Sequence, residues 1–193
     1  MTKQQRLEQA YERLNFDKKY LEQGFKCLAG ADEAGRGPLA GPVVAACVVL
    51  DYDNPPLEAN DSKKLSPAKR EALYEKIMAE AKYAGIGLCS EQEIDEINIL
   101  QASMLAMRRA LENSKAPADF LLADGNCLPG ALSAQREQAV VGGDGLSLCI
   151  AAASIIAKVT RDRIMLEYAQ NYPSTALMRI KATVPPSIGL CLK

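Results

Sequence analysis

Three short acidic segments carry the side chains best suited to chemistry in this 193-residue chain. The segments read ADEAGRG, LADGN and VGGDG, and each sets a carboxylate in or beside a glycine-containing turn. Each also follows a run of apolar residues that predicts a β-strand. Because neighbouring strand ends meet in an open α/β sheet, we expect these carboxylates to converge. They are Asp32, Glu33, Asp124 and Asp144.

Four carboxylates in one place would repel one another strongly. Hard divalent cations relieve that repulsion, and Mg²⁺ prefers oxygen ligands. Two such ions about 4 Å apart stabilise both the attacking and the leaving oxygen in phosphoryl transfer. The reaction that this pattern favours is therefore hydrolysis of a phosphodiester.

The spacing also has a simpler interpretation. Acidic residues beside glycine are ordinary turn residues, and consecutive strand residues point to opposite faces. Asp32 and Glu33 can share a site only if the strand ends there, which Gly35 and Gly37 would permit. Spacing alone leaves both interpretations open.

Composition excludes several other chemistries. The chain has no histidine, which rules out Ser-His-Asp and Cys-His catalysis. None of its six cysteines forms a Cys-x-x-Cys pair, so a zinc site is not expected. The formal net charge of −1 gives no indication of a nucleic-acid partner. Any attraction to phosphate must therefore come from local clusters of basic residues. Lys63 and Lys64, before a predicted helix, and Lys158 and Arg161 are candidates, although each could also be a solvated charge.

Strand and helix patterns alternate along the chain, which predicts an α/β fold. We expect strands at 28–31 (ending at Asp32-Glu33), 42–50, 83–89, 120–123 and 138–141. We expect helices at 1–24, from Ser66-Pro67, at about 93–111 and at about 147–168. The unbroken apolar run of 42–50 is typical of a strand that is buried on both faces.

The predicted helix at 1–24 has two interpretations. Its basic residues would suit an arm that binds nucleic acid, but interspersed acidic residues dilute that charge. Leu7, Tyr11, Leu14 and Leu21 fall on one stripe, which favours a helix that packs against the remaining chain.

Five ordered segments resemble a known family, the bacterial type 2 ribonuclease H called ribonuclease HII. They read GADEAGRGPLAGPVVAACVVL, NDSKKLS, EIDEINILQASMLAMRRAL, LLADGN and AAASIIAKVTRD, and the resemblance covers about 25–173. It implies the ribonuclease H-like fold, a central mixed sheet flanked by helices. It also implies an endonuclease for the RNA strand of RNA–DNA hybrids and for ribonucleotides embedded in duplex DNA. The expected products carry 3′-hydroxyl and 5′-phosphate ends.

The resemblance also implies roles for individual residues. Four match metal-binding carboxylates for two-metal catalysis with Mg²⁺ or Mn²⁺: Asp32, Glu33, Asp124 and Asp144. Gly35, Arg36 and Gly37 match a loop that reads the ribose 2′-hydroxyl, largely through its backbone. A Cβ at Gly37 would block that approach or strain the loop. Segments near phosphates contain Ser62, Lys63, Ser154 and Lys158.

Residues 174–193 depart from the family. They read STALMRIKATVPPSIGLCLK, where the family resembles YGF…HKGYGT…H. Codons can be chosen for this tail that, read from the last base of the Ser174 codon, encode YGFDAHKGYGTAKHRALPE. We therefore expect a reading-frame shift near codon 174, which also accounts for the missing histidines. The expected organisation is a helical extension at 1–24, a catalytic domain at 25–173 and a non-family tail at 174–193.

No membrane partner is expected, because the longest apolar stretch, Leu146 to Ala157, is too short to span a bilayer. We expect a cytoplasmic monomer whose partners are RNA–DNA hybrids and ribonucleotide-containing duplexes. One alternative is a folded but inactive or weakly active hybrid-binding protein, because of the altered tail. Another is a relative that acts on DNA junctions, against which the Gly-Arg-Gly loop argues.

Overall fold

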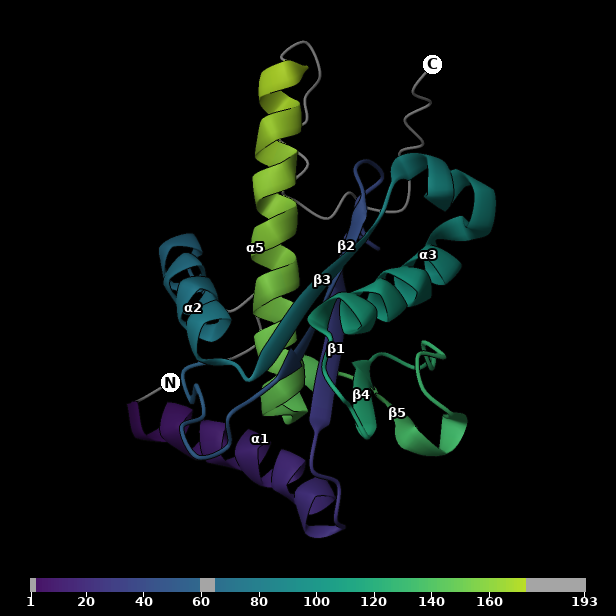
Figure 1. Ribbon diagram of the computed structural model, residues 1–193. Coiled ribbons are helices and arrows are strands. Elements are labelled where there is room, and N and C mark those ends of the chain that lie inside the picture. Colours follow the sequence, from purple (N-terminus) through teal and green to yellow (C-terminus); the bar gives the residue numbers. More distant parts are fainter. Residues whose placement is uncertain (1–2, 60–64, 173–193) are drawn as a thin grey trace.

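A five-stranded mixed sheet forms the centre of the computed structural model, which describes residues 3–59 and 65–172 (Figure 1). The strands lie in the order β3 (Tyr83–Cys89), β2 (Val43–Val49), β1 (Leu28–Ala34), β4 (Phe120–Asp124) and β5 (Glu137–Val140). β2 runs antiparallel to both of its neighbours, whereas β4 and β5 run parallel to β1. The expected α/β class with a mixed sheet is confirmed.

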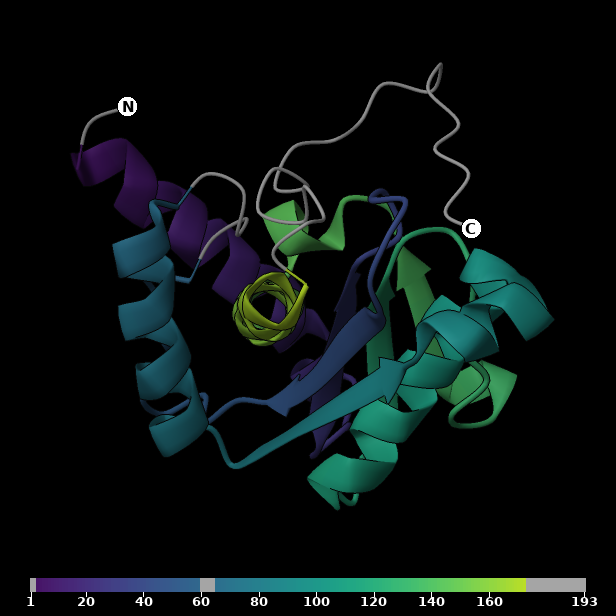
Figure 2. The ribbon, with the colours of Figure 1, turned by 90° about the horizontal axis from the view of Figure 1, so that it is seen from above.

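Helices cover both faces of the sheet. Seen from above, α5 (Leu148–Asn171) lies on one face beside α2 (Pro67–Glu80), and α3 (Glu91–Ser114) lies on the other (Figure 2). Every residue of β2 is buried, as its apolar run predicted, because it has a helix on each side. A short helix, α4 (Gly143–Leu146), joins β5 to α5, and a 3₁₀ turn covers Ala134–Arg136.

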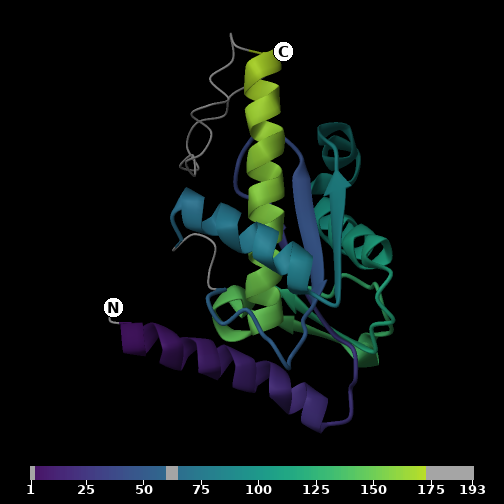
Figure 3. The ribbon, with the colours of Figure 1, turned by 60° about the vertical axis from the view of Figure 1, so that its left-hand side comes forward.

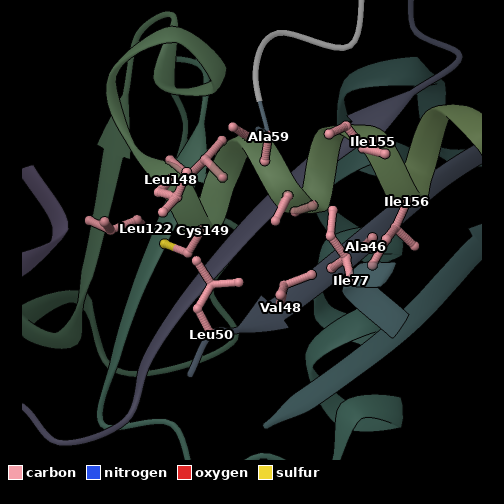
Figure 4. Close-up of a cluster of buried hydrophobic side chains, with 14 of the residues drawn as sticks. Ala46, Val48, Leu50, Ala59, Ile77, Leu122, Leu148, Cys149, Ile155 and Ile156 are labelled. Carbon is pink, nitrogen blue, oxygen red and sulfur yellow. The ribbon is translucent and has the colours of Figure 1, made fainter. Parts of the chain in front are cut away.

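The pleat of the sheet divides the core into two layers. In the layer under α5, Ala46 and Val48 of β2 and Leu122 of β4 pack with Ile155 and Ile156 (Figure 4). The intervening residues of the same strands pack under α3 with its buried methionines, Met104 and Met107. This alternation determines which strand residues face α5, and therefore which carboxylates can meet that helix.

A glycine lets α5 approach the sheet closely. A Cβ added to Gly30 of β1 would lie 2.6 Å from Sγ of Cys149, in the first turn of α5. No side chain can be accommodated at that distance. Gly30 therefore allows α5 to begin directly against β1, two residues before Asp32.

Two helices begin at the signals that the sequence carries. Ser66 caps α2 and Pro67 is its first residue. Ser90 and Glu93 form a capping box at the start of α3, so this helix begins slightly before the predicted Glu93. Asn98 has φ 67° and interrupts α3, and its side-chain oxygen accepts hydrogen bonds from Leu100 N–H and Gln101 N–H. Asn98 thus caps the second part of a helix that we expected to be continuous.

The N-terminal helix, α1 (Lys3–Glu22), crosses beneath the first turns of α5 (Figure 3). The predicted apolar stripe is partly wrong, because Leu7 and Tyr11 are each 48% exposed. Leu14 of that stripe is buried as predicted, and the buried face also carries Ala10, Arg13, Asp17 and Tyr20. Charged side chains on this face have partners inside the protein, as described below.

Several expectations lie outside the described residues. These are the placement of Ser62, Lys63 and Lys64 and the course of the tail at 174–193. Among the helices that the structure describes, none is long and apolar enough to cross a membrane.

Candidate active site

Asp32 lies within β1 and not at its end. The strand continues to Ala34, and Asp32 and Glu33 pair with Ala46 and Ala45 of β2. The expectation that the chain leaves the sheet at these acidic residues is therefore wrong, because the antiparallel ladder with β2 extends past them. Asp32 faces α5, where the Ser154 hydroxyl hydrogen-bonds its carboxyl group. The side chain is only 5% exposed.

Asp124 lies beside Asp32 on the neighbouring strand. Ala31 of β1 pairs with Ala123 of β4 in parallel register, so the next residue of each strand reaches the same level. Both carboxyl groups belong to the layer of the sheet that faces α5, since Leu122, two residues before Asp124, packs there. Adjacent parallel strands therefore bring two of the four predicted carboxylates together.

Asp144 reaches this region through a short turn after β5. Gly142 has φ 69°, which favours glycine, and leads into α4 with Asp144 in its first turn. Gly143 N–H donates to Asp124 Oδ1 at 2.6 Å, so the residue before Asp144 is bonded directly to Asp124. A sequence motif cannot reveal this backbone donor, because any residue except proline could supply the N–H.

The surroundings of Asp32 and Glu33 disfavour the ionised form of both carboxyl groups. Burial raises the pKa of Asp32 well above its usual value, and the charges of Glu33 and Asp124 raise it further. Burial also raises the pKa of Glu33, against the opposing effect of Arg36. Asp32 and Glu33 therefore interact even though the strand continues past them, so the condition that the strand must end there is wrong. The charge of Asp124 acts on both of them.

The carboxylate of Glu33 is only partly satisfied. Its Oε1 accepts a hydrogen bond from Arg36 Nη1 at 3.3 Å. Its Oε2 is buried and has no hydrogen-bond partner among the described residues. A buried oxygen without a donor is costly, and a cation would compensate that cost.

A buried arginine of α5 holds the loop from Gly35 to Pro42 in place. Arg161 of α5 donates from Nε to Pro42 O at 3.0 Å and from Nη2 to Ala40 O at 2.9 Å. Gly35 has φ 120°, and a Cβ there would lie 2.6 Å from Pro42 O. The interpretation of Arg161 as a solvated or phosphate-binding charge is wrong, because its guanidinium is buried and engaged with this loop.

Gly37 differs from Gly35 in this loop. A Cβ at Gly37 would meet no atom within 4 Å, and its φ lies outside the left-handed region. The expectation that alanine would strain the loop is therefore wrong for this structure. The open space beside Gly37 leaves its backbone accessible to a bound molecule.

Two other predicted substrate-binding residues lie on α5. Ser154 is buried and contacts Asp32, so it supports a carboxylate. Lys158 lies further along α5, is about one quarter exposed and donates to Asp162 Oδ1 at 2.5 Å. Lys158 is thus the more accessible of the two.

The donor set suits a hard divalent cation. The grouped oxygens are carboxylates, the ligands that Mg²⁺ and Mn²⁺ prefer. The unpartnered Glu33 Oε2 and the raised pKa of Asp32 both indicate a place where positive charge would be stabilising. Even so, no three acidic or cysteine side chains in the described ranges already stand close enough to hold a metal ion together.

Comparisons with known proteins identify the family of this chain. The family model described as ribonuclease HII matches residues 29–179. The ribonuclease HII of Endomicrobium trichonymphae is 54% identical over 159 residues, which are 82% of this chain and 75% of that protein. The ribonuclease HII of Magnetococcus marinus is 57% identical over 153 residues, covering 78% and 71%.

A solved structure resembles the described fold. The ribonuclease H2 from Pyrococcus horikoshii OT3 superposes with a TM-score of 0.66 at 28% identity, covering 84% of this chain and 82% of that one. The mixed sheet with helices on both faces is therefore the ribonuclease H-like fold. This chain belongs to the ribonuclease HII family, and it is a metal-dependent endoribonuclease of the ribonuclease H type 2 class.

Proposed function

We propose that this protein hydrolyses the RNA strand of RNA–DNA hybrids and cuts at ribonucleotides embedded in duplex DNA. The products would carry 3′-hydroxyl and 5′-phosphate ends. The observation that supports this most directly is that Asp32 and Asp124 directly follow the paired residues Ala31 and Ala123 of adjacent parallel strands, with Glu33 and Asp144 nearby. The chain has no histidine to provide another acid or base.

The four carboxylates would hold Mg²⁺ or Mn²⁺. When bound, such ions supply an activated water and stabilise the developing charge on the leaving oxygen. The residues of the chain orient this centre. Ser154 fixes the carboxyl group of Asp32, and Gly143 N–H fixes that of Asp124. Burial around Asp32 keeps its surroundings poorly solvated, which strengthens its interaction with a cation.

Substrate choice would come from the loop after β1. A ribose 2′-hydroxyl is the group that distinguishes RNA from DNA, and the backbone at Gly37 is open to contact. Arg36 is exposed and bonded to Glu33, so it links this loop to the carboxylates. Lys158 and, outside the described residues, Ser62 and Lys63 would contact phosphates.

The decisive experiment uses one duplex sequence in three forms: an RNA–DNA hybrid, a DNA duplex with a single ribonucleotide, and DNA alone. We expect Mn²⁺-dependent cutting of the first two and none of the third, with 3′-hydroxyl ends. Equal cutting of all three would contradict the proposal. A gel-shift on the same duplexes identifies the alternative, a hybrid-binding protein with little activity, by binding without cleavage.

A further inference from the structure

The N-terminal helix carries a fully buried carboxylate. Asp17 of α1 is 0% exposed and accepts three hydrogen bonds: from Ser147 Oγ at 2.6 Å, from Cys149 N–H at 2.9 Å and from the Tyr52 hydroxyl at 3.0 Å. Removing a carboxylate from water is costly unless its oxygens are well satisfied. These three donors satisfy it, and they determine what Asp17 holds in place.

Two of the three donors belong to the junction between α4 and α5. Ser147 ends α4 and caps α5, since its Oγ accepts the Ile150 N–H at 3.3 Å. The Cys149 N–H is one of the first-turn donors that have no partner within a helix. A carboxylate at this end of α5 is also favoured by the helix dipole. Asp17 therefore fixes the point at which α5 begins.

That junction lies immediately after the segment that carries Asp144. Ser147 N–H donates to Gly143 O at 2.8 Å, and Gly143 N–H donates to Asp124. The segment from Gly143 to Ser147 is thus attached to β4 at one end and to Asp17 at the other. Asp144 lies between these two attachments, and a displacement of either end would move its carboxylate.

α1 is itself held from a second direction, which lets it act as a fixed support. Arg13, one turn before Asp17, is 3% exposed and donates from Nη2 to Ala59 O at 3.0 Å. The Tyr52 hydroxyl, from the same connection after β2, donates to Asp17. Through Arg13, α1 is therefore attached by a contact that does not involve α5.

We propose that Asp17 is a positioning residue for the metal site: through Ser147 and Cys149 it holds Asp144 in register with Asp124. The inference rests on the proposed function, because it assumes that Asp144 is a metal ligand. It gives α1 a part in metal binding without any contact between α1 and the substrate.

The test measures binding of Mn²⁺ alone to the full chain, by electron paramagnetic resonance or calorimetry, well below the unfolding temperature. We expect Asp17→Ala and Ser147→Ala each to weaken Mn²⁺ binding about 10-fold, the lower end of the effect of outer-shell changes. Asp17→Asn keeps an oxygen for Cys149 N–H and gains a donor toward Ser147, so it should restore affinity to within about twofold.

Tyr52→Phe is the matched control. It removes the third hydrogen bond to the same carboxylate and the contact of the Tyr52 hydroxyl with the Cys149 thiol, but it keeps the bonds that Ser147 Oγ and Cys149 N–H donate to Asp17. It should lower stability and leave Mn²⁺ affinity unchanged. An equal loss of affinity in Tyr52→Phe would overturn the inference, because the loss would then follow stability and not position. Ser147→Ala carries the test by itself if Asp17→Ala does not fold.

The variant Asp144→Asn distinguishes a failure of the positioning role of Asp17 from a failure of the proposed metal site. It should weaken Mn²⁺ binding at least as much as Asp17→Ala. If Asp144→Asn weakens binding while Asp17→Ala and Ser147→Ala do not, the positioning role is refuted and the proposed site stands. If Asp144→Asn has no effect on Mn²⁺ binding, the assignment of Asp144 and the role of Asp17 both fail.

Discussion

Asp124 accepts a 2.6 Å hydrogen bond from the backbone N–H of Gly143, and this bond joins the end of β4 to the turn that carries Asp144. The residue before Asp144 is thereby bonded to Asp124, although the two acidic residues are distant in the sequence. The bond also satisfies one oxygen of Asp124 with a backbone donor. Glu33 Oε2 has no hydrogen-bond partner among the described residues and is available to a cation, from which the first prediction follows.

Neutralising single carboxylates should stop cleavage. We expect Asp32→Asn, Asp124→Asn and Asp144→Asn each to abolish cutting of an RNA–DNA hybrid, and a chelator to do the same. Binding of the hybrid should survive, because removing one negative charge does not weaken attraction to phosphates. Asp119→Asn is the control, since Asp119 accepts the N–H groups of Lys26 and Cys27 near the start of β1. Near-normal cutting by Asp124→Asn would refute the assignment.

The two glycines of the loop after β1 should respond differently to alanine. Gly35→Ala places a Cβ against Pro42 O at a φ of 120°, which should cost on the order of 2 kcal/mol of stability. Gly37→Ala meets no atom, so its stability should change by less than about 0.5 kcal/mol. If the Gly37 backbone approaches a ribose, hybrid cleavage should still fall. Urea unfolding and a cleavage assay on both variants decide this, and full activity of Gly37→Ala would count against the 2′-hydroxyl reading.

Stability should depend on the ionisation of Asp17. Burial is the main cause that raises its pKa from 3.8 to about 6, against the opposing hydrogen bonds from Ser147, Cys149 and Tyr52. The folded state therefore holds the proton more tightly than the unfolded state. This contribution is fully present below pH 3.8 and is lost as the pH rises through about 6, a decline on the order of 3 kcal/mol.

The measurement compares the unprotonatable variant Asp17→Asn with the unaltered protein. The other carboxylates, Asp32 included, titrate in both proteins and cancel in the difference. The free energy of unfolding of the unaltered protein, minus that of Asp17→Asn, should fall between about pH 4 and pH 6 and stay level above. A difference that is constant across this range would show that the pKa of Asp17 is not raised.

Two basic residues of α5 should separate stability from binding. Arg161→Met leaves the carbonyl groups of Pro42 and Ala40 without their donors, and we expect a loss on the order of 3 kcal/mol. Lys158→Met removes a partly exposed ion pair with Asp162, which is worth about 1 kcal/mol or less. If Lys158 contacts phosphate, its loss should weaken hybrid binding and reduce the salt dependence of binding. Unchanged salt dependence in Lys158→Met would remove it from the interface.

The departure of residues 174–193 from the family leads to a prediction about the nucleotide sequence of the gene. We expect the coding region to contain the family ending in another frame, beginning at the last base of the Ser174 codon. Sequencing the gene from its source tests this directly. Restoring the frame should add histidines and the KGYGT segment, and it should improve cutting at a single embedded ribonucleotide. A genomic sequence that encodes 174–193 in frame, with full activity of this chain, would refute the proposal.

Local patterns predicted most elements of the fold because their causes are local. The apolar valine run gave β2 its burial on both faces, and Ser66-Pro67 marked the start of α2. The glycine at 142 allowed the turn before Asp144. The acidic segments also located the neighbourhood of Asp32 and Asp124, although Asp32 lies within its strand and not at its end. In each case the residue acts on its own backbone or on adjacent residues, so a short stretch of sequence carries the information.

Partners from distant segments could not be predicted in this way. Arg13, Asp17 and Arg161 belong to residue types that are mostly exposed in proteins, yet all three are buried. Each one is hydrogen-bonded to a group far along the chain: Arg13 to Ala59, Asp17 to Ser147 and Arg161 to Pro42. Sequence by itself determined which elements form and which carboxylates could do chemistry. Only the tertiary structure decided which charges are buried and which groups they bond. The reason is that the donors and acceptors that compensate a buried charge come together only when the chain folds.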